Sequence, residues 1–285
     1  MSETAGSETA GSDTASPGAA NSLRPGAPGS APVQLRASLD GPAGAPVVVL
    51  GNSLGTTGEL WRPQLDALGK RFRVMRFEHR GHGGSPASAG PYSIGDLATD
   101  VLRLLDENGI DRASYCGVSL GGMVGMWLAA TAPARITALA LCSTSAWLRP
   151  ASMWRERAAQ VRAGGMSAIS QQVVGRWFTA AFRERDPATV ASFVTMVEST
   201  NPEGYAGCCE AIATMDLRPI LPSITAPAQV IAGAEDPATP PWHGAVIASG
   251  IRNARLHVIR GAAHLANISQ PGEFTAALLA HLTAQ

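Results

Sequence analysis

The stretch Ala113-Ser114-Tyr115-Cys116-Gly117-Val118-Ser119-Leu120-Gly121-Gly122, followed by the apolar run 123–130, decides the fold of this chain. A short run suited to a buried strand leads into Gly-x-Ser-x-Gly and then into a helix-forming segment. This layout is typical of a nucleophile elbow, a sharp turn that exposes a serine hydroxyl group. Gly117 and Gly121 allow the strand and the helix to approach closely. The pattern predicts Ser119 as the nucleophile.

A second match to the same pattern, Gly51-Asn52-Ser53-Leu54-Gly55, also follows an apolar strand. The next residues, Thr56-Thr57-Gly58, favour a loop, whereas the residues after Ser119 form an uninterrupted helix-forming stretch. We therefore expect Ser53 to lie in a loop at the end of an earlier strand.

Composition limits the size of the core and the kinds of partner. The chain has 285 residues, of which 45% are hydrophobic and 15% charged, so it can bury a large core as one domain with an insertion. Lys plus Arg and Asp plus Glu balance at 22 each, which gives no net field that would favour nucleic acid or an anionic membrane. No apolar run reaches transmembrane length. We expect neither a nucleic-acid nor a membrane partner, and the sequence does not define an oligomeric state.

Residues 1–32 form a low-complexity segment, with Ser-Glu-Thr-Ala-Gly at Ser2 and again at Ser7. The segment has too few apolar side chains to offset the entropy lost on ordering, so we expect a disordered tail before a domain over residues 33–285. It also lacks the early positive charge and the apolar centre of a secretory signal.

The four cysteines have neither metal-ligand nor disulfide-framework spacing. These features predict free thiols in a reducing cytoplasm.

Apolar patterning predicts strands and helices in alternation, which indicates an α/β fold with a mostly parallel central sheet and helices on both faces. The expected strands cover residues 34–39, 47–50, 72–77, 113–118, 136–142, 229–232 and 255–259. Ser93 and Asp96 resemble a capping box at the start of one helix, and Pro271 opens the last helix. Residues 146–221 carry helical patterning and no convincing strand, which predicts a helical cap over the strand ends.

A catalytic triad is expected at the carboxyl ends of the strands, where open parallel sheets gather their functional groups. Ser119, Asp236 and His264 all fall there, in an order known for Ser-His-Asp enzymes. Glu235 is the nearest alternative to Asp236, but an Asp-Pro pair at a strand exit better suits a fixed carboxylate. His264 would take the proton of Ser119, and Asp236 would hold the imidazole ring in the required tautomer.

Two backbone N–H groups would bind the oxyanion, that of Leu120 after the nucleophile and that of Leu54 in the earlier loop. The remaining histidines lack the position or the chain order for catalysis; they are His79, His82, His243, His257 and His281. His79 and His82 lie in a glycine-rich loop without a carboxylate or cysteine at metal-ligand spacing, so we expect them to shape that loop. The sequence therefore predicts neither a metal nor a cofactor.

From about Val33 onward these residues carry a family resemblance. The triad, the loop 78–85 and the strand order resemble the α/β-hydrolase fold. Several stretches resemble 3-oxoadipate enol-lactonases: Asn52-Ser53-Leu54-Gly55-Thr56, residues 117–122, Arg176-Trp177-Phe178-Thr179, Glu203-Gly204-Tyr205-Ala206, Cys209-Glu210-Ala211-Ile212 and Asp216-Leu217-Arg218. The resemblance implies hydrolysis of an anionic lactone, 3-oxoadipate enol-lactone, to 3-oxoadipate in the β-ketoadipate pathway, which degrades protocatechuate and catechol. Because the sequence ends at Gln285, just after its last expected helix, we expect no fused carboxymuconolactone decarboxylase.

The substrate implied by this resemblance carries a carboxylate, which a guanidinium group can bind with two parallel hydrogen bonds. Arg176 precedes Trp177 in a short aromatic patch, and Trp147 would form a second wall. We expect these three residues to contact the substrate. The alternative is a solvated or ion-paired Arg176 with Trp177 in the core of the cap. The next candidates for the carboxylate site are Arg149 and Arg155.

Fold and triad alone do not define the substrate. A broad-specificity carboxylesterase and a cofactor-free haloperoxidase or perhydrolase of the same fold are alternatives. A haloalkane dehalogenase is disfavoured because its elbow carries an aspartate where this chain has Ser119. A receptor that binds a small ligand on the same scaffold is the alternative from a non-enzymatic class. Labelling of Ser119 by a serine-directed phosphonate distinguishes the enzymes from the receptor.

Overall fold

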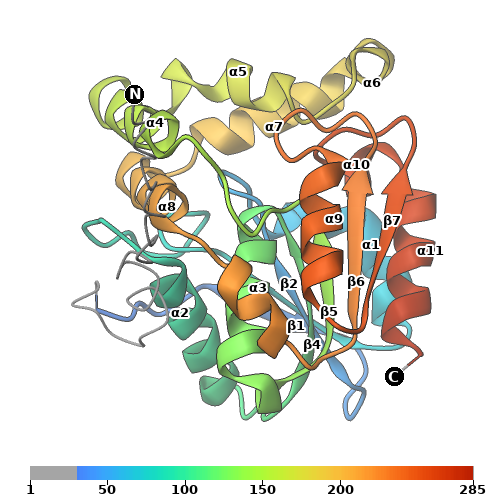
Figure 1. The fold of residues 1–285 in the computed structure, drawn as a ribbon. Helices are drawn as coiled ribbons and strands as arrows, with labels where there is room; N and C mark the ends of the chain where they lie inside the picture. Colours follow the sequence, from blue (N-terminus) through green and yellow to red (C-terminus); the bar gives the residue numbers. More distant parts are fainter. Residues whose placement is uncertain (1–30, 285) are drawn as a thin grey trace, which may run out of the picture.

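A seven-stranded sheet forms the centre of the protein (Figure 1). The computed structural model describes residues 31–284, so nearly all of the tail expected over residues 1–32 lies outside the described residues. The strand order is β1-β3-β2-β4-β5-β6-β7; β1 is antiparallel to β3, and the other neighbours are parallel. The strands are β1 Ala37–Asp40, β2 Val47–Gly51, β3 Arg73–Phe77, β4 Ala113–Val118, β5 Ile136–Cys142, β6 Ala228–Gly233 and β7 Ala254–Ile259. The predicted mostly parallel sheet is confirmed.

Helices cover both faces of this sheet, as expected (Figure 1). One face carries α2 (Ile94–Glu107), α3 (Leu120–Thr131) and α9 (Pro241–Gly250), and the other carries α1 (Arg62–Gly69) and α11 (Pro271–Leu282). The predicted capping box of Ser93 and Asp96 is present at the start of α2, and Pro271 begins α11 as expected. The short helices on this part of the chain are η2 (Gly58–Trp61), η3 (Pro133–Arg135) and α10 (Ala266–Ser269).

A helical excursion separates β5 from β6 and lies over the carboxyl ends of the parallel strands. In Figure 1 the arrowheads of β6 and β7 point toward it. Its helices are α4 (Ala151–Gly164), η4 (Met166–Ala168), α5 (Ser170–Gly175), α6 (Ala180–Arg185), α7 (Pro187–Glu198), α8 (Pro202–Thr214) and η5 (Arg218–Ser223). α4 packs against α8, and α5 against α7. We propose that residues 146–221 act as a cap over the strand ends.

The first strand begins later in the chain than the alternating pattern of residues 34–39 predicts. The backbone N–H group of Val33 donates to the Asp100 carboxylate (3.0 Å), and that of Arg36 donates to the Ser85 hydroxyl group (2.9 Å). Because side chains of the main domain accept these hydrogen bonds, the N–H groups of Val33 and Arg36 are not free to pair with a strand.

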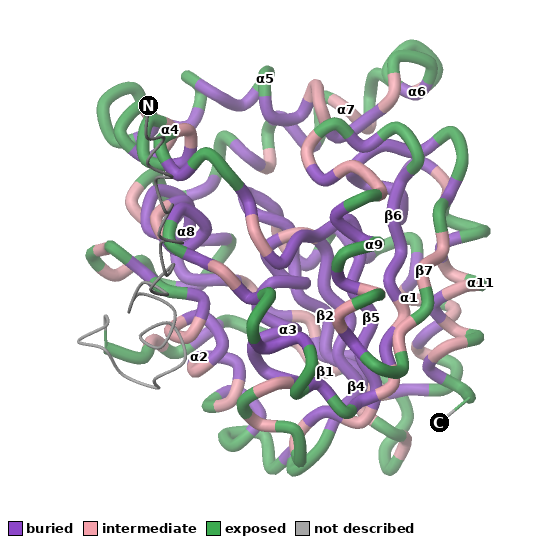
Figure 2. The backbone as a smooth tube through the Cα atoms, in the orientation of Figure 1, coloured by how far each residue is buried: buried purple, intermediate pink, exposed green. Residues whose placement is uncertain are grey.

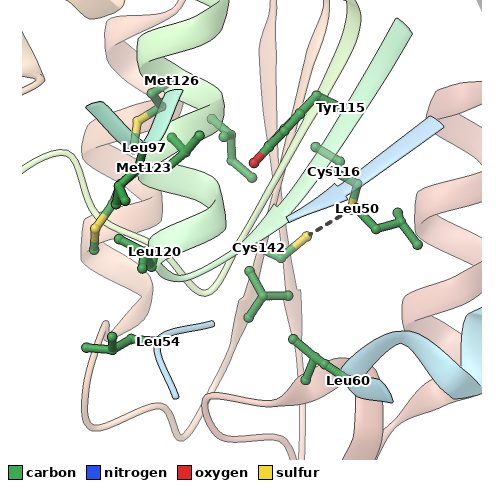
Figure 3. Packing of buried hydrophobic residues seen from close by; sticks show 14 of the residues in the cluster. Leu50, Leu54, Leu60, Leu97, Tyr115, Cys116, Leu120, Met123, Met126 and Cys142 are labelled. Atoms are coloured by element: carbon green, nitrogen blue, oxygen red, sulfur yellow. Dashed lines mark hydrogen bonds between the residues drawn. The ribbon is translucent and has the colours of Figure 1, made fainter. Parts of the chain in front are cut away.

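The inner strands of the sheet and the facing sides of its helices are largely buried, whereas the edge strands β1 and β7 are mostly half-buried or exposed (Figure 2). Every residue of β4 is buried, as expected for a strand covered on both faces. Figure 3 shows α3 beside β4, with Leu120, Met123 and Met126 on the helix and Tyr115 and Cys116 on the strand. The four cysteines are free and buried, in agreement with the sequence. Within residues 31–284, no helix is long and apolar enough to cross a membrane.

Candidate active site

Ser119 lies between β4 and α3 in a backbone conformation that side chains rarely adopt, with φ +54° and ψ −112°. Its N–H group donates to the carbonyl oxygen of Cys142 (2.9 Å), and its own carbonyl oxygen accepts a hydrogen bond from the Thr144 hydroxyl group (2.7 Å). Hydrogen bonds on both sides of the residue therefore hold the strained turn. This backbone geometry is the one that the elbow motif predicts.

Two glycines give the turn the space that it needs. A Cβ atom at Gly117 would lie 2.3 Å from the carbonyl oxygen of Gly121, and a Cβ atom at Gly121 would lie 2.3 Å from the carbonyl oxygen of Gly51. Both obstacles are backbone atoms, so they cannot rotate away as a flexible side chain can. The strand and the helix approach as closely as the sequence predicts.

Asp236 follows β6, and His264 lies in the loop after β7. The buried Asp236 carboxylate accepts hydrogen bonds from His264 Nδ1 (2.8 Å), from the Ala238 N–H group (2.8 Å) and from the Thr239 N–H group (3.0 Å). Burial raises the pKa of Asp236, but His264 and the hydrogen bonds from Thr239 outweigh this effect and lower the pKa to about 2. An ionised Asp236 requires the hydrogen on His264 Nδ1, which leaves Nε2 free to accept a proton. The alternative carboxylate, Glu235, is exposed.

A cavity of about 390 Å³ brings most of the expected site residues together. The expected residues that line it are Ser119, His264, Leu54, Trp147, Arg176 and Trp177. The first three come from loops at the carboxyl edge of the sheet, and the others come from the loop after β5 and from the proposed cap. The candidate nucleophile and base thus share one space with the expected substrate contacts.

The two expected oxyanion donors are backbone N–H groups near this cavity. Leu120 is the first residue of α3, where an N–H group has no acceptor within the helix. Leu54 lies in a turn closed by a hydrogen bond from Thr56 N to the Ser53 carbonyl oxygen (3.1 Å). Within residues 31–284, neither the Leu54 nor the Leu120 N–H group donates a hydrogen bond, so both are available to a ligand. Ser53 lies in a loop, as expected.

Residues 46–271 match the family described as alpha/beta hydrolase fold. The chain belongs to the α/β-hydrolase fold family. The central sheet, the helices on its two faces and the elbow geometry are the features of that fold described above. The fold class predicted from the sequence is confirmed.

Curated relatives of this α/β-hydrolase include two proteins of Acinetobacter baylyi. One, 3-oxoadipate enol-lactonase 2, is 39% identical over 246 residues, which cover 86% of this chain and 92% of the relative. The other, 3-oxoadipate enol-lactonase 1, is 34% identical, with coverage of 84% and 90%. The crystal structure of the enol-lactonase from Burkholderia xenovorans LB400 is 43% identical with a TM-score of 0.86, and the match covers 88% of this chain and 97% of that one. The resemblance to 3-oxoadipate enol-lactonases is confirmed.

Two buried histidines hold the loop after β2 in this α/β-hydrolase. His82 Nε2 accepts a hydrogen bond from Gly55 N (2.9 Å), and His82 Nδ1 donates to the Arg80 carbonyl oxygen (2.8 Å). His79 Nε2 donates to the Asn52 carbonyl oxygen (3.1 Å). Burial lowers the pKa of His79 to about 3 and that of His82 to about 4, so both rings are neutral at neutral pH. These contacts agree with a loop-shaping role; no cluster of three or more potential His, Cys, Asp or Glu metal ligands occurs in residues 31–284.

We expect the substitution His82→Gln to make the free energy of unfolding less dependent on pH between neutral pH and about pH 5. In the unfolded chain His82 titrates near the usual histidine pKa, whereas in the folded chain its pKa is about 4. Between these values the unfolded state binds more protons, so the free energy of unfolding falls as the pH falls, by about 2 kcal/mol from this residue at about pH 5. Urea unfolding of both proteins at neutral pH and near pH 5 measures the difference.

The substitution Val258→Gln is the matched control, because Val258 lies on the edge strand β7, is 39% exposed and carries no titratable group. This variant should lose as much stability on acidification as the wild-type protein. If His82→Gln and the wild-type protein lose equal stability between the two pH values, the neutral buried state assigned to His82 is wrong.

A backbone hydrogen bond joins the helical excursion to the loop of His264. The N–H group of Leu265 donates to the carbonyl oxygen of Trp177 at 3.1 Å. The Trp177 side chain is only 4% exposed and packs edge-on against Phe193, with 6.0 Å between the ring centroids. Trp177 therefore lies in the apolar core of the excursion and also lines the cavity. The sequence offered these two positions, the core and the substrate site, as alternatives.

The cavity-lining residues that were not expected from the sequence include Arg157, Tyr205 and His243. Of the two further arginine candidates, Arg149 lines the cavity and Arg155 is exposed on α4. Helical periodicity could have identified Arg157 from the sequence. Arg157 follows the buried Trp154 by three positions and therefore lies on the same face of α4. Arg155 is displaced from that face.

Proposed function

We propose that this α/β-hydrolase converts 3-oxoadipate enol-lactone and water into 3-oxoadipate, late in the degradation of protocatechuate and catechol. The names of its relatives support this substrate. The observation that carries the proposal is the lining of the cavity beside Ser119 and His264. Among the described residues, three arginines line it and no aspartate or glutamate does. A cavity with uncompensated positive charge suits an anionic substrate.

Ser119 is the nucleophile in this proposal. Its hydroxyl oxygen attacks the lactone carbonyl carbon while His264 Nε2 takes the hydroxyl proton. The ionised Asp236 stabilises the resulting imidazolium, and the Leu54 and Leu120 N–H groups bind the oxyanion. The amino end of α3 adds a favourable field, because a helix N-terminus attracts negative charge.

Collapse of the tetrahedral intermediate breaks the bond between the carbonyl carbon and the ring oxygen. His264 returns its proton to that oxygen, and the enol formed becomes the ketone of 3-oxoadipate. Because the substrate is a ring, the leaving group stays attached to the acyl chain on Ser119 until water, activated by His264, releases the product. Neither step uses a cofactor.

The proposed substrate contacts beyond the triad are Trp147, Arg176 and Trp177. The ring of Trp147 lies beneath the guanidinium groups of Arg218 (4.1 Å to the ring centroid) and Arg149 (5.7 Å), which fix it as a cavity wall. Arg176 is half-buried at the end of α5, and burial lowers its pKa. A guanidinium group that has lost part of its hydration without gaining a carboxylate is ready to bind one.

A comparison of kcat/KM for the enol-lactone and for p-nitrophenyl acetate tests the proposal. We expect kcat/KM for the enol-lactone to be higher on the order of 100-fold, because contacts with its carboxylate also stabilise the transition state. Comparable values would instead indicate a broad-specificity carboxylesterase, and peroxide-dependent halogenation would indicate a haloperoxidase. If the protein binds the ligand but neither turns it over nor is labelled at Ser119 by a phosphonate, it is a receptor. We also propose a cytoplasmic location, which the four free cysteines support.

A further inference from the structure

The arginines of the proposed cap fall into two groups. Some are paired with carboxylates: Arg162 binds Glu203 at 2.7 Å and also Glu210, and Arg218 binds Asp216 at 2.6 Å. Arg157 and Arg176 belong to the other group, because neither forms an ion pair with any residue of the described chain. Both line the cavity that contains Ser119. Among the other described arginines of residues 146–221 without an ion pair, Arg149 also lines the cavity, and Arg155, Arg183 and Arg185 are exposed. Arg157 and Arg176 are therefore the unpaired arginines of the helices that a ligand in the cavity can reach.

Arg157 and Arg176 face the cavity from different helices and influence each other. Arg157 comes from α4, where its guanidinium group lies over the Trp154 ring at 4.6 Å from the centroid. Arg176 follows the last residue of α5. Burial lowers the pKa of Arg176, and the positive charge of Arg157 lowers it further. Repulsion between the two guanidinium groups is unfavourable, and a bound anion would offset it.

Tyr205 supplies a third polar group at the same place. It lies on α8, lines the cavity, and has a side chain that is 0% exposed. Within residues 31–284 its hydroxyl hydrogen has no acceptor, and Arg157 is the neighbour placed to donate to its oxygen. All three residues line the same cavity, and burial raises the pKa of Tyr205 while the charges of Arg157 and Arg176 and the hydrogen bond from Arg157 act in the opposite direction. A buried hydroxyl hydrogen without an acceptor is costly, so a ligand that accepts this hydrogen bond is stabilised.

We propose that Arg157, Arg176 and the hydroxyl group of Tyr205 form a binding subsite for a carboxylate group on the substrate. The subsite extends the proposed function, on which it rests, because it gives the substrate two guanidinium groups and a phenol where the sequence suggested Arg176 alone. The guanidinium groups donate to both carboxylate oxygens, and Tyr205 donates its hydroxyl hydrogen to one of them. Substrates with this charge are selected by the cap, and the reacting carbonyl group remains at Ser119.

Two esters that differ only at the far end of the acyl chain test the subsite. They are the mono-p-nitrophenyl ester of adipic acid, which carries a free carboxylate, and p-nitrophenyl hexanoate, which is neutral. In Arg157→Gln and in Arg176→Gln, KM for the anionic ester should rise on the order of tenfold, with hexanoate kinetics nearly unchanged. Tyr205→Phe should raise KM for the anionic ester about threefold, since it removes one hydrogen bond.

Arg155→Gln is the matched control, because Arg155 lies on the same helix but is exposed. It should leave both esters unaffected. Equal losses on the two esters in Arg157→Gln and Arg176→Gln, or no loss on either, would overturn the subsite.

Calorimetric titration with adipate and with neutral adipamide gives a second measurement that does not depend on turnover. Wild-type protein should bind adipate and not adipamide, and Arg157→Gln should weaken adipate binding about tenfold. Equal adipate affinity in the two proteins would contradict the proposal. If the variants lose charge selection but the enol-lactone is not a substrate, the subsite stands and the proposed function fails. If the enol-lactone is turned over with the same KM in every variant, the function stands and the subsite fails.

Discussion

Ser119→Ala should lower kcat for the enol-lactone on the order of 10⁵-fold, and His264→Ala should do the same. The reason is that the hydroxyl group and its base act as one unit, so loss of either removes covalent catalysis and leaves only the oxyanion donors. The double variant should be no slower than either single one. Steady-state kinetics with the enol-lactone, and circular dichroism to show that each variant is folded, measure these effects.

Ser53→Ala is the internal control, since Ser53 belongs to the same Gly-x-Ser-x-Gly pattern and lines the same cavity. Its contribution to the mechanism is confined to the backbone beside Leu54, so we expect less than about a threefold change in kcat. A loss in Ser53→Ala as large as in Ser119→Ala would mean that the nucleophile has been assigned to the wrong serine.

Gly121→Ala should damage both activity and stability. Its Cβ atom would lie 2.3 Å from the Gly51 carbonyl oxygen, and the Gly121 N–H group already donates to the Asn52 carbonyl oxygen at 2.9 Å. The helix must therefore move away from the loop after β2, and the N–H groups of Leu54 and Leu120 lose their mutual alignment. We expect kcat to fall on the order of 100-fold, as when one oxyanion donor is removed. Urea unfolding should show a loss of about 2 kcal/mol.

Gly272→Ala is the comparison variant for Gly121→Ala. Gly272 lies in the first turn of α11, and a Cβ atom there would meet no atom within 4 Å. Alanine favours helix, so this variant should be as stable as the wild-type protein or slightly more stable. Wild-type activity and stability in Gly121→Ala would show that the close approach at the elbow is not needed.

Much of the fold could be predicted because its signals are local. The elbow needs glycines at fixed spacing around Ser119, and the helix start at Ser93 needs an acceptor three residues later; both patterns are readable within a few positions. The order Ser119, Asp236, His264 could be read as well, because each residue follows a recognisable strand. The hydrogen bond that His264 Nδ1 donates to the Asp236 carboxylate (2.8 Å) agrees with the expected pairing of these two residues.

Features that depend on distant partners were not predicted in detail. The sequence suggested that His82 shapes a loop, but its partner Gly55 is 27 positions earlier and no local pattern identifies it. Likewise, Arg157 and Arg162 lie on one helix, yet only Arg162 meets carboxylates of α8, so their different roles come from tertiary packing. The start of β1 was misplaced for the same physical reason, because Asp100 and Ser85 take the hydrogen bonds of the preceding residues.

The hydrogen bond from Leu265 to the Trp177 carbonyl oxygen limits how new specificities can be introduced into this scaffold. Transplanting residues 146–221 from another hydrolase would exchange the acceptor of a bond that fixes the chain next to His264. A chimaera with an unmatched backbone at that point would inherit a new binding surface together with a displaced base. Recombination, in nature or in the laboratory, should therefore succeed best when the segment that follows β7 is exchanged along with the helices above it.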